Sequence, residues 1–252
     1  MTRIISVISG KGGVGKTTTV ANLGTALVNL GKNVIIIDGN VTTPNLSLHL
    51  GIPFYKVTLH DVLKGKVRPE MAIYEHSGLK IIPASLSAEA VKDVNVKKLE
   101  STLWNLLGKA DIIIIDAAAG LGKEALSAIE IADELIIITN PELPAVTDAL
   151  KTIKLAQDFG TKVLGVIVNR VKGHKYELNN DDIESMLEVP VIATVPEDIN
   201  VPKSIANKKP VVNYKPRSKA SQKFKKLAAN IIGEKIEIKK ESLIKRLFPW
   251  LT

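Results

Sequence analysis

Short apolar runs alternate with longer amphipathic stretches along this chain. Several runs are apolar at every position, which is typical of strands covered by helices on both faces. The expected strands are Ile4–Ile8, Val34–Ile37, Leu79–Ile82, Ile112–Ile115, Leu135–Ile138, Val163–Val168 and Val191–Val195.

Amphipathic stretches between these runs predict helices. Examples are Thr17–Leu30, which is followed by Gly31, then Pro144–Phe159, which is followed by Gly160, and Asp181–Leu187. The alternation predicts an α/β fold, with a doubly wound, mostly parallel sheet and helices on both faces. A chain of 252 residues is long enough for one such domain. Ligands bind beyond the carboxyl ends of the strands in these sheets, so residues that follow strands are the candidates for chemistry.

A glycine-rich segment, KGGVGKTT, follows the first strand directly. The pattern G-x-x-x-x-G-K-[ST] is met by Gly10, Gly15, Lys16 and Thr17, between a strand and a helix as the motif requires. Glycines let backbone N–H groups turn toward phosphate oxygens, and the helix N-terminus adds partial positive charge. We expect Lys16 to reach the phosphates and the Thr17 hydroxyl to hold Mg²⁺. The full phosphate-binding segment comprises Gly10, Lys11, Gly12, Gly13, Val14, Gly15, Lys16, Thr17 and Thr18.

Two aspartates close apolar strands. Asp38 follows Val34–Ile37, and a carboxylate there is expected near the metal and the phosphates. Asp116 follows four isoleucines, which is the Walker B pattern, in which the carboxylate holds a metal-bound water. The alternative for Asp116 is a strand-terminal residue that only makes a turn.

Lys11 lies inside the phosphate-binding segment, which therefore resembles the deviant Walker A loop of the MinD/ParA ATPases. The resemblance extends over nearly the whole chain and is closest to the archaeal MinD-like branch. It implies a P-loop NTPase fold, ATP and ADP as ligands with Mg²⁺, and a homodimer that forms with ATP. In such a dimer Lys11 would reach the phosphates of the partner's nucleotide.

Residues 38–51 resemble the first switch of that family, with one departure. Asn40 stands where a second aspartate usually assists the attacking water, and an amide can orient water but cannot accept its proton. We therefore expect slow basal hydrolysis, with Lys11, Lys16, Asp38 and Asn40 as the catalytic set. Residues 117–120 read AAAG in place of the usual S/T-P-A-G and would form the second switch, which senses the γ-phosphate.

Two further segments resemble the family's adenine site. Asn169 and Arg170 follow one strand, and we expect Asn169 to bond to the base edge. Pro196, Glu197 and Asp198 follow the next strand, and their backbone would close the pocket. The segment 139–142, TNPE, also matches and is expected near the dimer interface. The four histidines show no spacing for metal or triad chemistry and receive no role.

The composition excludes several other kinds of site and protein class. The chain has no cysteine, which rules out disulfides, thiolate metal clusters and the iron–sulfur branches of the family. No apolar run approaches the ~20 residues of a membrane span. Met1, Thr2 and Arg3 lead directly into a strand without the features of a signal peptide, so we expect a cytoplasmic protein.

The excess of positive charge, +8 in total, is concentrated in one segment of the chain. The segment 203–226, here called the basic window, holds nine lysines and arginines and no acidic residue; without it the formal charge falls to −1. Such a segment suggests a polyanion, either nucleic acid or an anionic membrane surface. The alternative is a solvated helix face.

Residues 233–252 form a segment of different composition, here called the tail, after an ATPase domain at 1–232. Lysine and arginine are interspersed with an apolar helical face, and Pro249 ends or kinks the helix. Such a segment is typical of an interfacial membrane anchor and resembles the MinD targeting tail. Two tails in a dimer would bind together; the alternative is a last helix packed on the core. The expected membrane contacts are Leu243, Ile244, Leu247, Phe248, Trp250 and Leu251.

The sequence thus predicts a MinD-like ATPase that dimerises with ATP and cycles between the cytoplasm and an anionic membrane. Such a machine positions a division site or another cellular structure, with an unidentified protein activator or cargo. One alternative is a ParA-type partition ATPase whose basic window binds DNA. The other is an ATP-gated scaffold with very slow hydrolysis.

Overall fold

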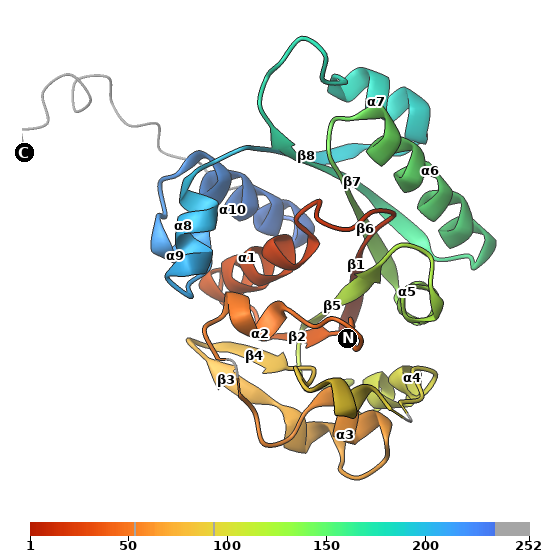
Figure 1. Cartoon of the computed structure of the whole chain (residues 1–252). Coiled ribbons are helices and arrows are strands. Elements are labelled where there is room, and N and C mark those ends of the chain that lie inside the picture. Colours follow the sequence, from red (N-terminus) through yellow and green to blue (C-terminus); the bar gives the residue numbers. More distant parts are fainter. Residues whose placement is uncertain (53, 93, 235–252) are drawn as a thin grey trace, which may run out of the picture.

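The computed structural model describes residues 1–52, 54–92 and 94–234. Within these ranges eight strands form one sheet in the order β3-β4-β2-β5-β1-β6-β7-β8, and every pairing except β3–β4 is parallel (Figure 1). This confirms the expected α/β fold. The strands are β1 Arg3–Ser9, β2 Val34–Asp38, β3 Tyr74–His76, β4 Leu79–Ile82, β5 Ile112–Ala119, β6 Glu134–Thr139, β7 Lys162–Val171 and β8 Val191–Pro196.

Helices cover both faces of the sheet. One apolar cluster packs α3 to α7 against one face, and a second packs α1, α2, α9 and α10 against the other. The α-helices are α1 Lys16–Asn29, α2 Leu46–His49, α3 Leu59–Leu63, α4 Lys98–Trp104, α5 Lys123–Glu130, α6 Leu143–Asp158, α7 Asn180–Leu187, α8 Asn200–Ala206, α9 Val211–Tyr214 and α10 Lys219–Ile231. Two 3₁₀ turns, η1 Pro69–Ala72 and η2 Ala88–Val91, complete the described elements.

The unbroken apolar runs are explained by this layering. In β5, Ile113 and Ile115 belong to one cluster, while Ile112 and Ile114 belong to the other. Successive side chains of a strand point to opposite faces, so a strand buried on both faces needs an apolar residue at every position. The central strands position the site because this double burial fixes their register.

Two elements differ from the predicted pattern. The edge strand β3 was not predicted, because its Tyr74-Glu75-His76 sequence is only partly buried and lacks an apolar run. It turns back antiparallel to β4 through Ser77 and Gly78, both at positive φ. The strand β5 also continues to Ala119, three residues beyond Asp116, where it pairs with Ser9 of β1.

Strands β1, β2, β5, β7 and β8 end at the same edge of the sheet, which brings together the segments that follow them. None of the helices in the described ranges has the length and apolar character needed to cross a bilayer. Within the tail, only residues 233 and 234 are described, so the expected anchor at 243–251 lies outside the described residues.

Candidate nucleotide site

The loop between β1 and α1 is shaped by its glycines. Gly13 and Gly15 adopt φ values of 80° and 100°, the left-handed region that glycine occupies without strain. A Cβ atom on Gly15 would lie 2.2 Å from Asn169 Nδ2, and one on Gly10 would lie 2.4 Å from the carbonyl oxygen of Asp148. The loop therefore sits tightly against its neighbours, and it leads directly into the N-terminus of α1 at Lys16. Oriented backbone N–H groups at such a terminus favour an anion.

Three of the predicted residues meet beside this loop. The ammonium of Lys16 lies 3.2 Å from Asp116 Oδ1, and the Thr17 hydroxyl donates to Asp116 Oδ2 at 2.6 Å. Asp116 is 1 % exposed and Lys16 is 8 % exposed. A hydroxyl and a carboxylate oxygen are ligands that Mg²⁺ accepts, and Mg²⁺ commonly keeps several waters and phosphate oxygens besides one or two carboxylates. The described residues contain no group of three or more His, Cys, Asp or Glu side chains placed to hold a metal ion.

Asp38 lies next to Asp116, because β2 and β5 are neighbours and the two aspartates are register partners. The Asp38 carboxylate accepts a hydrogen bond from the Leu46 N–H at 3.1 Å through Oδ2. Its other oxygen, Oδ1, has no hydrogen-bond partner among the described residues. Burial, followed by the charge of Asp116, raises the pKa of Asp38 to about 8. Two adjacent buried carboxyl groups, one with an unpartnered oxygen, fit a site that receives a cation.

Asn40 is engaged with its own loop. Its Nδ2 donates to the Thr43 carbonyl at 2.7 Å, and its Oδ1 accepts from the Thr43 N–H and hydroxyl, each at 3.2 Å. The Asn40 amide therefore closes the turn that follows Asp38. The Thr42 hydroxyl hydrogen-bonds to Glu124 of α5, which ties this turn to the helix after residues 117–120.

His60 is the residue near the site that the sequence reading missed. Its Nδ1 accepts from the Ser85 N–H at 3.0 Å, which leaves Nε2 to donate to the Val41 carbonyl, also at 3.0 Å. Burial lowers the pKa of His60, which favours the neutral ring. The contacts reach 19 and 25 positions along the chain, so no local spacing reveals them. His60 thereby fixes the backbone next to Asn40.

His49 also lies within the electrostatic reach of Asp116. Burial lowers the pKa of His49, and the Asp116 carboxylate acts in the opposite direction.

The residues expected to frame a base also come together. They enclose a pocket of about 180 Å³ whose walls come from the phosphate loop, the start of α1, β7, the end of β8 and the segment after it, α8 and α10. The predicted residues in its lining are Gly15, Thr18, Asn169, Arg170, Pro196, Glu197 and Asp198.

Hydrogen bonds hold this pocket in place. Asn169 Nδ2 donates to the Val14 carbonyl at 2.7 Å, and Asn140 Nδ2 donates to the Asn169 carbonyl at 2.9 Å. The Asp198 carboxylate accepts from the N–H groups of Asn200 and Ala220, and it thereby anchors α8 and α10. Asn140, from the segment expected near a dimer interface, thus supports the pocket within its own chain.

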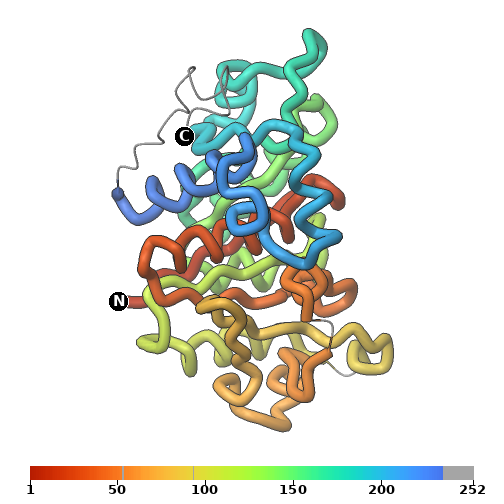
Figure 2. The backbone as a smooth tube through the Cα atoms, turned by 90° about the vertical axis from the view of Figure 1, so that its left-hand side faces the viewer, coloured from red at the N-terminus to blue at the C-terminus, as the bar shows by residue number. Residues whose placement is uncertain are grey.

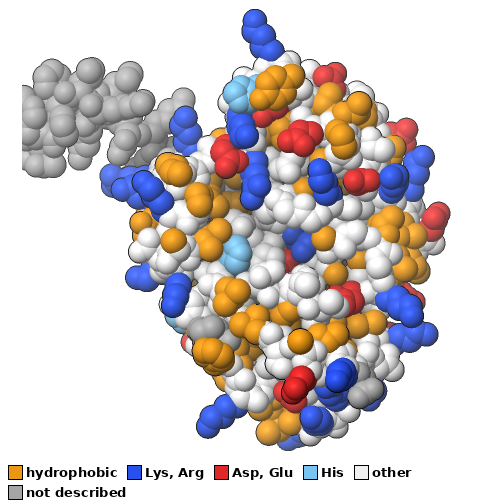
Figure 3. Space-filling model, in the orientation of Figure 1, with side chains coloured by type: hydrophobic (Ala, Val, Ile, Leu, Met, Phe, Trp, Pro, Cys, Tyr) orange, Lys and Arg blue, Asp and Glu red, His pale blue; other side chains and the backbone are white. Residues whose placement is uncertain are grey.

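Two predicted features lie at the surface. Lys11 is exposed at the rim of the loop, and no ion pair of Lys11 is found in the described part of the chain. The basic residues of the window lie in α8, in α10 and in the segments that flank α9. Figure 3 shows Lys and Arg side chains on the side of the molecule that carries these helices, and others elsewhere on the same face. All nine are exposed except Lys225, which is half-buried and donates to the Pro216 carbonyl.

Comparison with known proteins points to one family. Residues 5–211 match the CobQ/CobB/MinD/ParA nucleotide binding domain. The chain is 44% identical over 252 residues to an uncharacterized ATP-binding protein of Methanocaldococcus jannaschii, a match that covers 98% of this chain and 96% of the relative. It is 37% identical over 253 residues to the septum site-determining protein MinD of Thermotoga maritima, covering 96% and 92%.

A solved structure agrees with these relatives. The septum site-determining protein MinD complexed with Mg-ADP from Pyrococcus horikoshii OT3 superposes with a TM-score of 0.89 at 40% identity, and the match covers 94% of this chain and 100% of that one.

Because Asp38 and Asp116 are adjacent and buried, we expect the stability of the folded protein to depend on pH. The pKa of Asp38 in the folded protein, about 8, exceeds the ~3.9 of an unfolded aspartate. Its contribution to stability is therefore fully present below pH ~4 and is lost as the pH rises through 8. With chelator and without nucleotide, the melting temperature of Asp38→Asn should rise relative to that of the parent from pH 5 to pH 9. The expected rise is roughly 10 °C, since about three pH units below the folded pKa correspond to about 4 kcal/mol and 1 kcal/mol to about 2–4 °C at this size.

Thermal unfolding followed by circular dichroism at pH 5, 7 and 9 measures this difference. Asp158→Asn, an exposed change at the end of α6, is the control and should show no pH-dependent difference. A difference for Asp38→Asn that stays constant across the three pH values would contradict the assignment.

Proposed function

This chain belongs to the CobQ/CobB/MinD/ParA nucleotide-binding family, as its phosphate loop predicted, and we propose that it is a MinD-like ATPase that cycles on and off a membrane. The observation that carries the proposal is the meeting of Lys16, Thr17, Asp116 and Asp38 beneath a glycine loop with Lys11 at its rim. ATP dimerises the protein, hydrolysis to ADP releases it, and the cycle positions a division site or a comparable structure.

Each part of the site has a task in nucleotide binding. Backbone N–H groups of the loop and the first turn of α1 bind phosphate oxygens, and Lys16 supplies a positive charge to them. Thr17 and Asp116 hold Mg²⁺, Asp116 through water. Bound Mg²⁺ would neutralise phosphate charge. The pocket lined by Asn169 and residues 196–198 holds the adenine, since it opens beside the phosphate loop at Gly15 and Thr18.

Exposed apolar side chains support a homodimer at this edge of the sheet. Leu121 and Leu143 are 42% and 58% exposed and follow β5 and β6, and Ile199, 66% exposed, follows β8. We take these three side chains as candidate contacts of the dimer, because apolar surface beside a functional site suits an interface. A twofold dimer through this surface would bring Lys11 of each subunit toward the partner's phosphates. The segment 139–142 begins at the last residue of β6 and leads into α6 at Leu143.

The tail supports the membrane part of the proposal through its sequence. A basic segment with a helical apolar face and Trp250 beside Pro249 suits the headgroup region of an anionic membrane. One short anchor binds weakly, whereas two anchors in one dimer bind together, so dimerisation with ATP would control the affinity. We place the ATPase domain at 1–232 and the anchor at 233–252.

A ParA-type function on DNA is the second candidate. The exposed basic window over α8 to α10 favours a polyanionic partner, and duplex DNA is one. The scaffold alternative rests on Asn40, whose amide hydrogen-bonds to Thr43, and on the run of alanines at 117–119.

Vesicle sedimentation distinguishes these functions. The full chain should sediment with anionic vesicles in ATP and far less in ADP, while a chain ending at Glu234 should stay in the supernatant in both. Binding to duplex DNA with a steep loss of affinity on adding salt, and no binding to vesicles, would favour the ParA-type function instead.

Lys11→Ala should abolish the ATP-dependent dimer while leaving nucleotide binding by the single subunit, because Lys11 acts on the partner's phosphates. Light scattering after size exclusion in ATP and ADP measures the mass, and a fluorescent ATP analogue measures binding. Lys16→Ala should lose nucleotide binding itself, and Lys154→Ala, an exposed change on α6, should behave as the parent. A normal dimer from Lys11→Ala would refute the proposed role across the interface.

Asn40→Asp should raise basal phosphate release by about tenfold or more, because a carboxylate can accept a proton from the attacking water. Asn45→Asp is the matched control, since the Asn45 amide donates to the same Thr43 carbonyl but has no expected role in hydrolysis. Steady-state phosphate release with saturating Mg·ATP gives the rates. Parent turnover well above that of Asn40→Asp would overturn the explanation for slow hydrolysis.

A further inference from the structure

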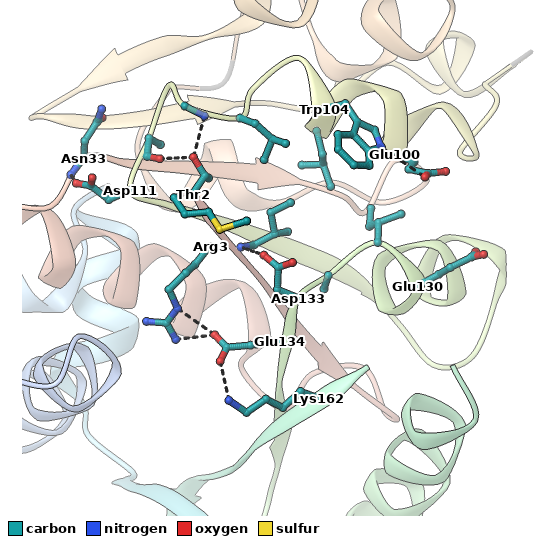
Figure 4. A pocket seen from close by; sticks show the side chains of 18 residues that line it. Thr2, Arg3, Asn33, Glu100, Trp104, Asp111, Glu130, Asp133, Glu134 and Lys162 are labelled. Carbon is teal, nitrogen blue, oxygen red and sulfur yellow. Dashed lines mark hydrogen bonds and ion pairs between the residues drawn. The ribbon is translucent and has the colours of Figure 1, made fainter. Parts of the chain in front are cut away.

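A larger cavity lies at the opposite edge of the sheet from the phosphate loop. Its volume is about 990 Å³, at the upper end of the range of small-ligand sites. It is lined by the residues at or before the starts of β1, β2, β5, β6 and β7, by α4 and by the end of α5. Figure 4 shows Trp104 and Glu100 on one side of this cavity and Arg3, Glu134 and Lys162 on the other.

Large apolar side chains line the cavity without being covered. Trp104 is 66% exposed and Leu107 is 40% exposed, and both stand beside the buried Leu103. An exposed tryptophan in a concave surface of this size is typical of a binding site.

Among the charged side chains of the lining, carboxylates predominate. Five carboxylates line the cavity, against the two cationic side chains of Arg3 and Lys162, and both of those cations already pair with Glu134, at 2.5 and 3.2 Å. Neither Glu130 nor Glu100 has an ion pair within the described ranges, and the Glu100 carboxylate accepts a hydrogen bond from Trp104 Nε1 at 3.5 Å. The lining therefore suits an occupant that is both apolar and cationic. The carboxylates are Glu100, Asp111, Glu130, Asp133 and Glu134.

The described chain ends next to this cavity. Arg3, which lines the cavity, donates from Nη1 to the carbonyl of Ile231 at the end of α10, at 2.8 Å. Glu234 pairs with Lys32 at 3.7 Å. Figure 2 shows the N-terminus and the end of α10 on the same side of the molecule. Eighteen residues follow Glu234, a length of about 27 Å even as a helix, so they reach the cavity without difficulty.

The composition of those residues matches the lining. Residues 235–252 carry five basic and two acidic side chains, and 243–251 carry two basic and none acidic. The apolar side chains of that segment are suited to cover Trp104 and Leu107. We propose that the tail docks in this cavity of its own subunit when no membrane is present.

The consequence rests on the proposed function, because the apolar face that docks is the face expected to enter lipid. Each subunit would then hide its own anchor until a membrane competes for it. The cavity also has a connection to the nucleotide site, because α5 begins directly after residues 117–122 and its last residue, Glu130, lines the cavity.

Tryptophan quenching tests the docking without lipid or nucleotide. The chain has two tryptophans, so Trp250→Phe leaves Trp104 as the only one. Acrylamide quenching of Trp104 should be at least about twofold weaker in the full chain than in a chain ending at Glu234, because the docked tail covers the indole. Leu247→Asp in the full chain should restore strong quenching, since it breaks the apolar face while every residue of the folded domain is kept.

A matched probe controls for general effects of the tail. In a Trp104→Phe, Trp250→Phe chain, Tyr176→Trp places the indole on an 80% exposed position after β7, at the opposite edge of the sheet. Its quenching should not depend on the tail. Equal quenching of Trp104 with and without the tail would overturn the proposal, as would protection that disappears on roughly tenfold dilution, because the tail would then come from a second copy.

The experiments test the docking proposal and the proposed membrane function independently. Tail-dependent vesicle binding without protection of Trp104 would leave the membrane function standing and overturn the docking. Protection of Trp104 without vesicle binding would do the reverse. When both hold, Leu107→Asp should raise vesicle binding of the ADP form several-fold over the parent, and an unchanged value would contradict the hidden anchor.

Discussion

The architecture of the site depends on two aspartates held side by side at the ends of adjacent parallel strands. Asp38 and Asp116 are register partners, both are buried, and one cationic side chain, Lys16, lies 3.2 Å from Asp116. Burial of the Asp38 carboxyl, and after it the nearby charge of Asp116, makes ionisation of both groups unfavourable and raises the pKa of Asp38. A cation held by Thr17 and Asp116 would relieve this cost, so binding of Mg²⁺ would stabilise the pair of carboxyl groups.

The elements of the sheet that carry this pair were predictable. Strands buried on both faces need apolar residues at every position, so the sequence alone predicts strands at Ile112–Ile115 and Val34–Ile37. The aspartates that follow these strands were therefore expected at the edge of the sheet where ligands bind. The loop with Lys16 and Thr17 was predictable because its glycines allow a tight backbone conformation that other residues adopt only with strain. Local sequence carries these features because each depends on neighbours within a few positions.

The contacts that cross the fold were not predictable. His60 joins Val41 to Ser85, Thr42 reaches Glu124, and β3 pairs at the edge although its sequence has no strand pattern. The large cavity was missed for the same reason, since its lining comes from five strand starts and two helices that are distant in the sequence. A single sequence shows which residues are suited to chemistry, but the packing decides which of them meet.

The two edges of the sheet carry different features, and the same strands and helices connect them. The carboxyl edge holds the phosphate loop and the aspartates, while the opposite edge holds an acidic, apolar cavity beside the end of α10. Helix α5 runs between them, tied to the turn of Asn40 through Glu124 at its first turn and bordering the cavity with Glu130 at its last residue. A rigid helix of eight residues cannot shift at one end without moving the other. A change in the turn that follows Asp38 would thus be felt at the cavity, which gives a single chain a physical path between its nucleotide and its tail.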